Sequence, residues 1–328
     1  MKKIVMLLVG IVICCACNDE EKSVATFDPS VIQPAETFID PRDGHEYPCI
    51  QVGNQIWMCE NLAYQLPHGA FGGCYTWDEK PVSFASLEAE VPNEIFKSEV
   101  NRVKEEHLAE LPGMEPMFVE IFLENLDHGS TQADVLKLYK NATPTFYDLF
   151  EPVYQTLLNE AIKAAIIPFA TEHIALAEKM NGNYSKEYGF LYTWIGAQIA
   201  IPEGWHLPSD EEWLALEMAL GISSSEAMKK NEWRGEKAGE LLNEGGSTGF
   251  NIKFAGANVY EPSREMNYTR KNISSYFWTR TTEALNDSIN LAIIRSTAAY
   301  TDKIWRGTSR ISNHYNVLYS VRCVRDAK

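Results

Sequence analysis

The chain has 328 residues, a formal net charge of −16 and 45% hydrophobic residues. These values are typical of a globular protein with one large domain or two ordinary ones. The acidic balance argues against nucleic acid as a partner, because binding to nucleic acid requires a basic surface.

The first seventeen residues have the pattern of a secretory signal peptide. Two lysines precede an apolar run over residues 4–13, which is shorter than the roughly 20 apolar residues of a membrane-spanning helix. The segment ends at Cys17 and resembles a bacterial lipoprotein box in which this cysteine is lipidated. Cys14 stands where the box usually has an aliphatic residue, so cleavage before Cys15 stays open as an alternative.

This N-terminal pattern predicts where the protein resides. We expect a signal peptide over residues 1–16 and a polar tether over residues 17–35, followed by the folded body. The resemblance implies a lipid anchor in the outer membrane. The acidic segment that follows Cys17 resembles signals that place lipoproteins on the cell surface.

Residues 36–85 are predicted to be rich in β-strand and to begin the folded body. Apolar and polar side chains alternate over residues 46–52 and over residues 55–58. The intervening Gly53-Asn54 is a typical two-residue hairpin turn. We therefore expect two antiparallel strands joined by a tight turn.

Four cysteines lie outside the signal, and in an exported chain they allow three disulfide pairings. The hairpin would place Cys49 and Cys59 nearly opposite each other, which favours a disulfide between these two. A zinc site is the weaker alternative, because the spacings are wide and no cysteine pair has a histidine at ligand spacing.

Residues 86–182 differ in character and are predicted to form an all-helical insertion. The segment is rich in Glu, Ala, Leu and Lys, and its apolar residues recur at helical spacing between prolines. It carries 17 acidic and 7 basic side chains, which we interpret as a solvated helical surface. A membrane-lying amphipathic helix over 159–178 is the alternative, and it is disfavoured because such helices prefer Lys and Arg.

The body resumes over residues 183–328 with short aromatic segments and two predicted helices. Ser209 and Glu212 form a capping box at the start of the first helix. Asp210 and Glu211 lie in its first turn, where carboxylates interact favourably with the helix dipole. The sequence has no metalloprotease, nucleophile-elbow or phosphate-binding motif.

Seven of the eight tryptophans divide into two groups by their surroundings. One group lies in apolar segments and is assigned to the core, because aromatic side chains dominate cores. This core group is Trp57, Trp205, Trp213 and Trp278. The second group lies in less apolar segments and is predicted to contact a ligand. This group is Trp77, Trp233 and Trp305, two of which are directly followed by Arg234 and Arg306. A guanidinium beside an aromatic ring is a common recognition pair.

Several short blocks on both sides of the helical insertion resemble one known family. The blocks are residues 43–44 with 47, 52–58 with 60–62, 188–189 with 191–194, 202 with 204–213, 249–250, 277–279 and 320–324. In this order they resemble the Fibrobacter succinogenes major paralogous domain, which occurs in secreted and lipid-anchored bacterial proteins. The resemblance implies an α+β fold similar to C-type lectins, with a body of short strands and two helices that the helical insertion interrupts.

The resemblance also suggests where calcium would bind. Calcium-dependent sugar binding in C-type lectins uses a Glu-Pro-Asn loop and a Trp-Asn-Asp strand, and this chain has Glu-Pro-Ser at 261–263 and Leu-Asn-Asp at 285–287. The candidate calcium ligands are therefore Glu261, Asn286 and Asp287, because calcium requires several converging oxygen atoms. Our expectation is nevertheless that the protein works without a cofactor, since short motifs often match by chance.

These observations predict a non-catalytic, lipid-anchored protein of the outer membrane, exposed on the cell surface. The lectin-like loops are expected to bind a glycan or another envelope protein. Two alternatives stay open. One is an enzyme on a scaffold like that of the formylglycine-generating enzyme, and the other is a scaffold whose helical insertion binds an envelope protein.

Overall fold

The computed structural model describes residues 27–80, 91–107, 116–129, 132–142, 144–259, 266–286, 289–311 and 317–327. Cys17, Glu261 and Asp287 lie outside these residues, as do the predicted signal peptide and most of the predicted tether. In the part of the chain that is described, no helix is both long enough and apolar enough to span a membrane.

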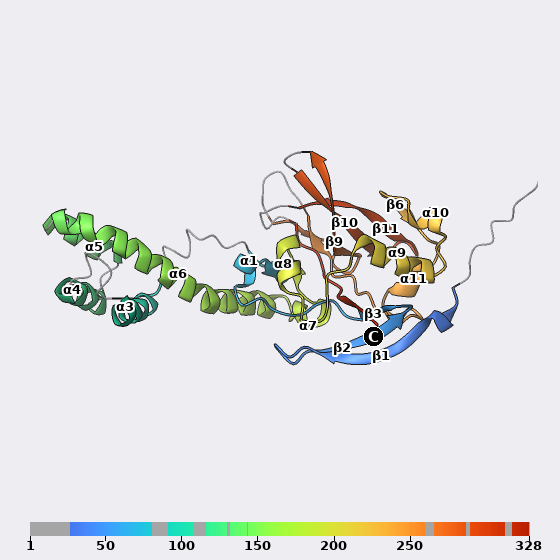
Figure 1. Ribbon diagram of the computed structural model, residues 1–328, viewed down its shortest axis with the longest axis horizontal. Helices are drawn as coiled ribbons and strands as arrows, with labels where there is room; N and C mark the ends of the chain where they lie inside the picture. Colours follow the sequence, from blue (N-terminus) through green and yellow to red (C-terminus); the bar gives the residue numbers. More distant parts are fainter. Residues whose placement is uncertain are drawn as a thin grey trace, which may run out of the picture.

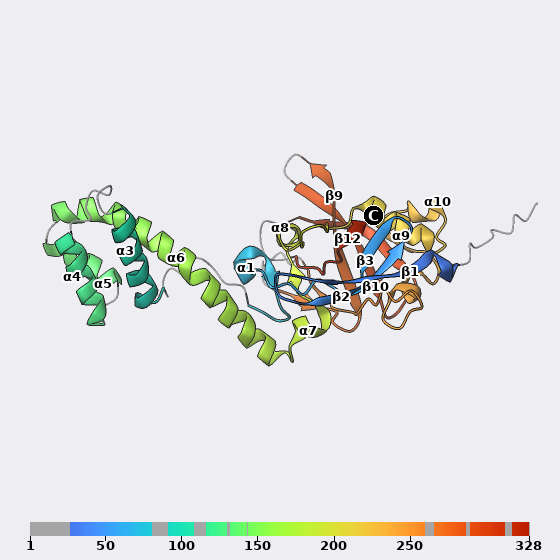
Figure 2. The same ribbon diagram turned by 60° about the horizontal axis from the view of Figure 1, so that its bottom comes forward.

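The described chain consists of a mixed body and a helical arm that extends from one end of the body (Figures 1 and 2). The body contains two four-stranded antiparallel sheets, two two-stranded sheets and several short helices. The arm consists of helices only. The protein therefore has an α+β fold, as the sequence predicts.

The first sheet joins the two ends of the body. Strands β1 (Ile32–Ile39), β2 (Glu46–Val52) and β3 (Gln55–Met58) follow one another, and β3 also pairs with β12 (Val324–Asp326). Val52 pairs with Gln55, so Gly53 and Asn54 form the predicted two-residue turn. Gly53 has φ of 58°, a conformation that glycine adopts without strain. Segments from opposite ends of the sequence thus share one sheet.

The second sheet has the strand order β6-β11-β10-β9 and is antiparallel throughout. Its strands are β6 (Glu232–Arg234), β9 (Ser274–Asn286), β10 (Ile289–Ala298) and β11 (Ile304–Arg310). The two smaller sheets pair β4 (Cys74–Tyr75) with β5 (Leu191–Tyr192) and β7 (Ala257–Asn258) with β8 (Tyr268–Thr269).

Helix α9 (Asp210–Ala219) has the predicted capping box. The Ser209 side chain accepts a hydrogen bond from the Glu212 amide, and the Glu212 side chain accepts one from the Ser209 amide. Further short helices cover the body besides the two that the sequence predicts. The described body helices are η1 (Pro29–Val31), α1 (Gly69–Gly72), α7 (Tyr184–Tyr188), α8 (Trp194–Ile199), α9, α10 (Ser224–Ala227) and α11 (Ala238–Leu242).

The tryptophans assigned to the core are all buried, which confirms that prediction. They are Trp57, Trp205, Trp213 and Trp278. The Trp57 ring on β3 contacts the Trp213 ring on α9 edge-on, with 5.0 Å between ring centroids. The Phe250 ring contacts both, at centroid distances of 5.6 and 5.8 Å. Segments that precede and follow the arm in sequence therefore pack in one core.

The arm has an apolar core of its own. Its helices are α3 (Asn93–His107), α4 (Pro116–Asp127), α5 (Gln132–Ala142) and α6 (Pro144–Met180). The Phe96 ring on α3 contacts the rings of Phe122 and Tyr154 at centroid distances of 5.8 and 5.7 Å. Full burial of one such side chain contributes about 1.5–3 kcal/mol, so this cluster stabilises the contacts between the arm helices. Phe71 on α1 of the body also packs against it.

Helix α6 connects the arm to the body. Its N-terminal half packs in the arm core, whereas Ile174 in its C-terminal half belongs to the core of the body. A Cβ atom on Gly69 would lie only 2.8 Å from the Cβ of Ala170, so α1 approaches α6 closely here. Pro168 lies between the two halves and lacks the N–H that would continue the helical hydrogen bonds.

The predicted Cys49–Cys59 disulfide is absent. Cys49, Cys59, Cys74 and Cys323 are all buried free thiols. The strand register explains the error, because Cys49 on β2 pairs with Met58 on β3 and not with Cys59. Adjacent strand residues point to opposite faces, so Cys59 does not face Cys49 directly across the hairpin.

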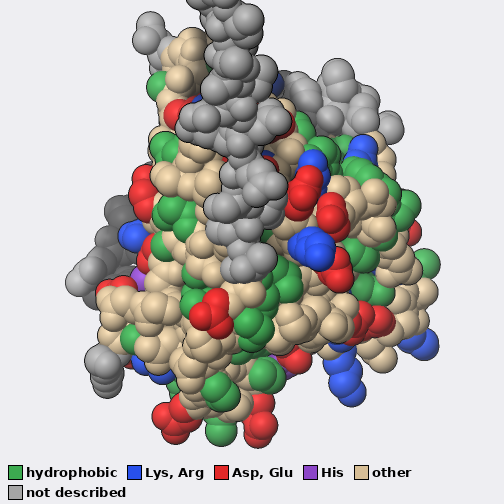
Figure 3. All heavy atoms as spheres, turned by 90° about the vertical axis from the view of Figure 1, so that its right-hand side faces the viewer, with side chains coloured by type: hydrophobic (Ala, Val, Ile, Leu, Met, Phe, Trp, Pro, Cys, Tyr) green, Lys and Arg blue, Asp and Glu red, His purple; other side chains and the backbone are tan. Residues whose placement is uncertain are grey.

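Figure 3 views the end of the body that faces away from the arm. Acidic, basic and hydrophobic side chains are interspersed over this face, and neither charge sign forms a continuous patch there. A mixed surface of this kind gives no electrostatic indication of a highly charged partner at this end.

Candidate functional site

Tryptophan and arginine alternate along β6 and β11. Trp233 pairs with Trp305 across the two strands. Successive residues of a strand point to opposite faces of the sheet. Trp233 and Trp305 therefore share one face, and Arg234 and Arg306 lie on the other. The predicted Trp–Arg recognition pairs are wrong, because neighbours in the sequence are separated by the sheet.

Trp233, Trp305 and Tyr300 form what we call the aromatic cluster. The two indole rings meet edge-on with 5.7 Å between centroids, and the Tyr300 ring meets Trp233 at 5.8 Å. Both indoles are half-buried, whereas Tyr300, in the loop between β10 and β11, is 61% exposed. The cluster is thus held by strand pairing and still offers aromatic surface to solvent.

Gly307 allows the Trp305 indole to lie close to its own strand. A Cβ atom at Gly307 would lie 2.3 Å from the Nε1 atom of Trp305, so the indole would have to move if residue 307 had a side chain. The indole orientation therefore depends on the missing side chain two residues further along the same face.

An open depression of about 750 Å³ adjoins the aromatic cluster through Tyr300. Its wall includes the carboxylates of Glu240, Glu244 and Asp302 and the amide of Asn243, and its lining contains no basic side chain. Carboxylate and amide oxygens accept hydrogen bonds from hydroxyl groups. The cluster and the depression together therefore combine aromatic surface with acceptors for a neutral, hydroxyl-rich ligand.

Asp302 fixes the wall of this depression. Its carbonyl oxygen accepts hydrogen bonds from the amides of Gly239 at 2.6 Å and Glu240 at 3.3 Å. Its carboxylate accepts one from the Lys237 amide at 3.3 Å. The β10–β11 loop that carries Tyr300 is thereby tied to the start of α11.

Trp77, the third tryptophan predicted to contact a ligand, lies in a different cluster. Its ring packs against Tyr184 and Tyr268 at centroid distances of 5.7 and 5.4 Å. The Lys271 ammonium lies 5.2 Å from the ring centroid. The structure thus brings Trp233 and Trp305 together and leaves Trp77 apart from them, packed in a small apolar cluster.

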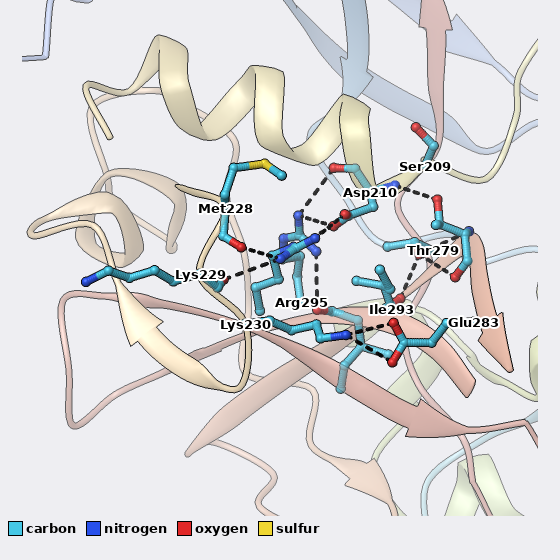
Figure 4. A network of polar contacts seen from close by, with 12 residues as sticks. Ser209, Asp210, Met228, Lys229, Lys230, Thr279, Glu283, Ile293 and Arg295 are labelled. Atoms are coloured by element: carbon cyan, nitrogen blue, oxygen red, sulfur yellow. Dashed lines mark hydrogen bonds and ion pairs between the residues drawn. The ribbon is translucent and has the colours of Figure 1, made fainter. Parts of the chain in front are cut away.

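The opposite face of the sheet carries a buried ionic layer, which we call the arginine layer. It consists of Arg234, Arg295 and Arg306 on the strands and Asp210 and Glu217 on α9. The two acidic residues are seven positions apart, which places both on the same side of the helix. Figure 4 shows Asp210 of α9 facing Arg295 of the sheet.

Each carboxylate of the arginine layer contacts two guanidinium groups. Asp210 contacts Arg306 through both its oxygens, at 2.9 and 2.5 Å, and Arg295 at 2.7 Å. Glu217 contacts Arg295 at 2.6 Å and Arg234 at 2.5 Å. Burial alone would raise the pKa of Asp210, but the hydrogen bond from Arg306 and the charge of Arg295 hold this pKa below its usual value.

The structure gives no support to a metal centre in the described residues. No group of three or more His, Cys, Asp or Glu side chains there is arranged to hold a metal ion. Asn286 lies exposed at the end of β9, and the two other candidate calcium ligands are among the residues without a description. The predicted calcium site thus stays a prediction.

Sequence reasoning did not find Tyr300 or the acidic wall of the depression. Glu240, Glu244 and Asp302 come from two segments about sixty residues apart and meet only because α11 packs on the β10–β11 loop. The one signal in the sequence is the short spacing of Tyr300 and Trp305.

The fold and the site define a mixed α+β protein whose second sheet presents aromatic rings on one face and packs on a helix through the other. A family model of the Fibrobacter succinogenes major domain matches residues 156–325, slightly more than half of the 328 residues. The chain belongs to this family. The match includes α9, α11 and the whole second sheet. No curated protein matches the chain. No solved structure matches it either.

Proposed function

We propose that this protein is a non-catalytic binding protein of the cell envelope, and that the aromatic cluster and the adjoining depression bind a glycan. The observation that carries the proposal is the cross-strand pair of Trp233 and Trp305, extended by the exposed Tyr300 at the rim of an acidic depression. Large amphipathic aromatic rings provide contact area at low entropic cost, and they dominate binding surfaces for that reason.

The chemistry of the depression favours a neutral glycan over an acidic one. Three carboxylates line it and no basic side chain does. These carboxylates would repel a uronic or sialic acid, whereas they would accept hydrogen bonds from sugar hydroxyls. The apolar face of a sugar ring would pack against the indoles. We therefore expect neutral or amino sugars as ligands.

The N-terminal pattern supports a place in the envelope. Residues 1–16 have the pattern of a signal peptide, and Cys17 stands at the position of a lipidated cysteine. A lipid on Cys17 would anchor the protein in the outer membrane with the body outside the bilayer. Membership of the family is compatible with this location.

A glycan array tests the proposal. The purified protein is expected to bind neutral or amino sugars, and Trp305→Ala is expected to weaken binding about tenfold or more. Trp77→Ala is the matched control, because this tryptophan packs in another cluster. Equal binding by the wild type and Trp305→Ala would contradict the proposed site.

A second candidate function is protein binding by the helical arm. The arm has its own core, extends away from the body and exposes Leu138 by 54% and Ile121 by 39% (Figure 2). Deletion of the arm would also remove Ile174 from the core of the body, so a surface substitution is the better test. Leu138→Glu is expected to abolish capture of an envelope protein if the arm is the binding surface, and unchanged capture would exclude that face.

A further inference from the structure

Two arginines of the arginine layer bind carboxylates through the same edge of their guanidinium groups. The Nε and Nη2 atoms form one edge, whose two N–H groups point in the same direction as a fork. Arg306 binds both oxygens of Asp210 through this fork. Arg295 uses it for Glu217 and Asp210.

Arg322 also donates hydrogen bonds through its Nε and Nη2 atoms, but its acceptors are neutral oxygens and not a carboxylate. Its Nε donates to the side-chain oxygen of Asn61 at 2.9 Å, and its Nη2 donates to the carbonyl of Asn251 at 2.9 Å. Its Nη1 donates to two further carbonyl oxygens. Each guanidinium nitrogen of Arg322 therefore has an acceptor, although none of these acceptors is a carboxylate.

Arg234 is the exception among these buried arginines. Its side chain is 1% exposed, and its Nη1 donates to Glu217 at 2.5 Å. Its Nε and Nη2 have no hydrogen-bond partner in the described protein. The complete fork of Arg234 is therefore buried without an acceptor, although an unpartnered buried donor destabilises a fold, and a charged one more so.

The arginine layer also has more positive than negative groups. Three guanidinium groups face two carboxylates, so the layer carries one excess positive charge. Trp213 lies between Asp210 and Glu217 in the sequence of α9, and its Nε1 is also buried without a partner. The hydroxyls of Ser275 and Thr297, which pair on the arginine face of the sheet, are buried without a partner as well, and a hydroxyl can donate or accept. All these groups can donate, so an acceptor with one negative charge would satisfy them. An uncompensated buried charge is costly.

We propose that the fork of Arg234 holds a small monovalent anion, of the halide class, between the second sheet and α9. The single excess charge sets the valence of the anion. The 1% exposure of the arginine sets its size, since an organic acid could not enter without opening the core. The anion completes the arginine layer and stabilises the contact between α9 and the sheet that carries the aromatic cluster.

Crystals of the wild-type protein grown with sodium bromide test this directly by anomalous scattering. The expected result is a bromide peak within hydrogen-bond distance of the Arg234 Nε and Nη2 atoms. A water molecule there, or the Glu226 carboxylate, which accepts from the neighbouring Gly235 amide at 2.8 Å, would overturn the proposal.

Thermal unfolding gives an independent test in solution. Sodium chloride is compared with sodium gluconate at equal ionic strength, and the unfolding temperature of the wild type is expected to rise with chloride concentration. Arg234→Met is expected to lose this chloride dependence, while Arg280→Met, at an exposed guanidinium, retains it. A chloride response that is the same in Arg234→Met and the wild type would overturn the proposal.

Discussion

The two faces of the second sheet have opposite chemistry although they are built from neighbouring residues. One face presents Trp233 and Trp305 half-exposed, and the other buries Arg234 and Arg306 beneath α9. Each tryptophan is directly followed by its arginine in the sequence. The comparison teaches that strand alternation, and not nearness in sequence, decides which side chains share a site.

The largest expected effect comes from removing an acid of the buried face. Glu217 is fully buried and contacts two guanidinium groups, so Glu217→Gln removes a negative charge that both of them face. We expect a loss of about 3–5 kcal/mol in the free energy of unfolding, measured by urea denaturation. Glu211→Gln, on the exposed side of the same helix, is the control and should change little. A loss below about 1 kcal/mol for Glu217→Gln would mean that the layer does not stabilise the fold.

A smaller loss in the free energy of unfolding is expected when the pH is lowered. The folded-state pKa of Asp210 lies below its usual value of 3.8, so its ionised form stabilises the fold above that value. This contribution is lost as the pH falls through the folded-state pKa. The free energy of unfolding should therefore decrease below about pH 4, and Asp210→Asn should show a shallower decrease. Parallel pH curves for the two proteins would show that Asp210 does not contribute.

Much of the body could be predicted from local patterns. The Gly53-Asn54 turn and the Ser209–Glu212 capping box depend on residues close in sequence, and both are present. The helical insertion was recognised because 3.6-residue periodicity is a local signal. The buried tryptophans followed from their apolar neighbours.

The candidate site could be predicted only in part, because it is assembled across strands. Trp233 and Trp305 were each predicted to contact a ligand, which stays a prediction, and nothing in the sequence showed that they pair with each other or that Tyr300 joins them. Arg234 and Arg306 were assigned to a ligand because each directly follows a tryptophan, whereas strand alternation places them on the other face of the sheet. The prediction of a Cys49–Cys59 disulfide was wrong for a similar reason. A shift of one residue in the strand register turns a side chain to the other face of the sheet.

The most direct test compares two neighbouring residues of β11, Trp305→Ala and Arg306→Met, in one set of glycan-binding and unfolding measurements. Our account predicts that Trp305→Ala loses ligand binding and keeps nearly all of its stability. It predicts that Arg306→Met loses about 2–4 kcal/mol of stability and keeps its binding under conditions where it is folded. Loss of binding in Arg306→Met with unchanged stability would contradict the account, because the arginine face would then belong to the ligand site.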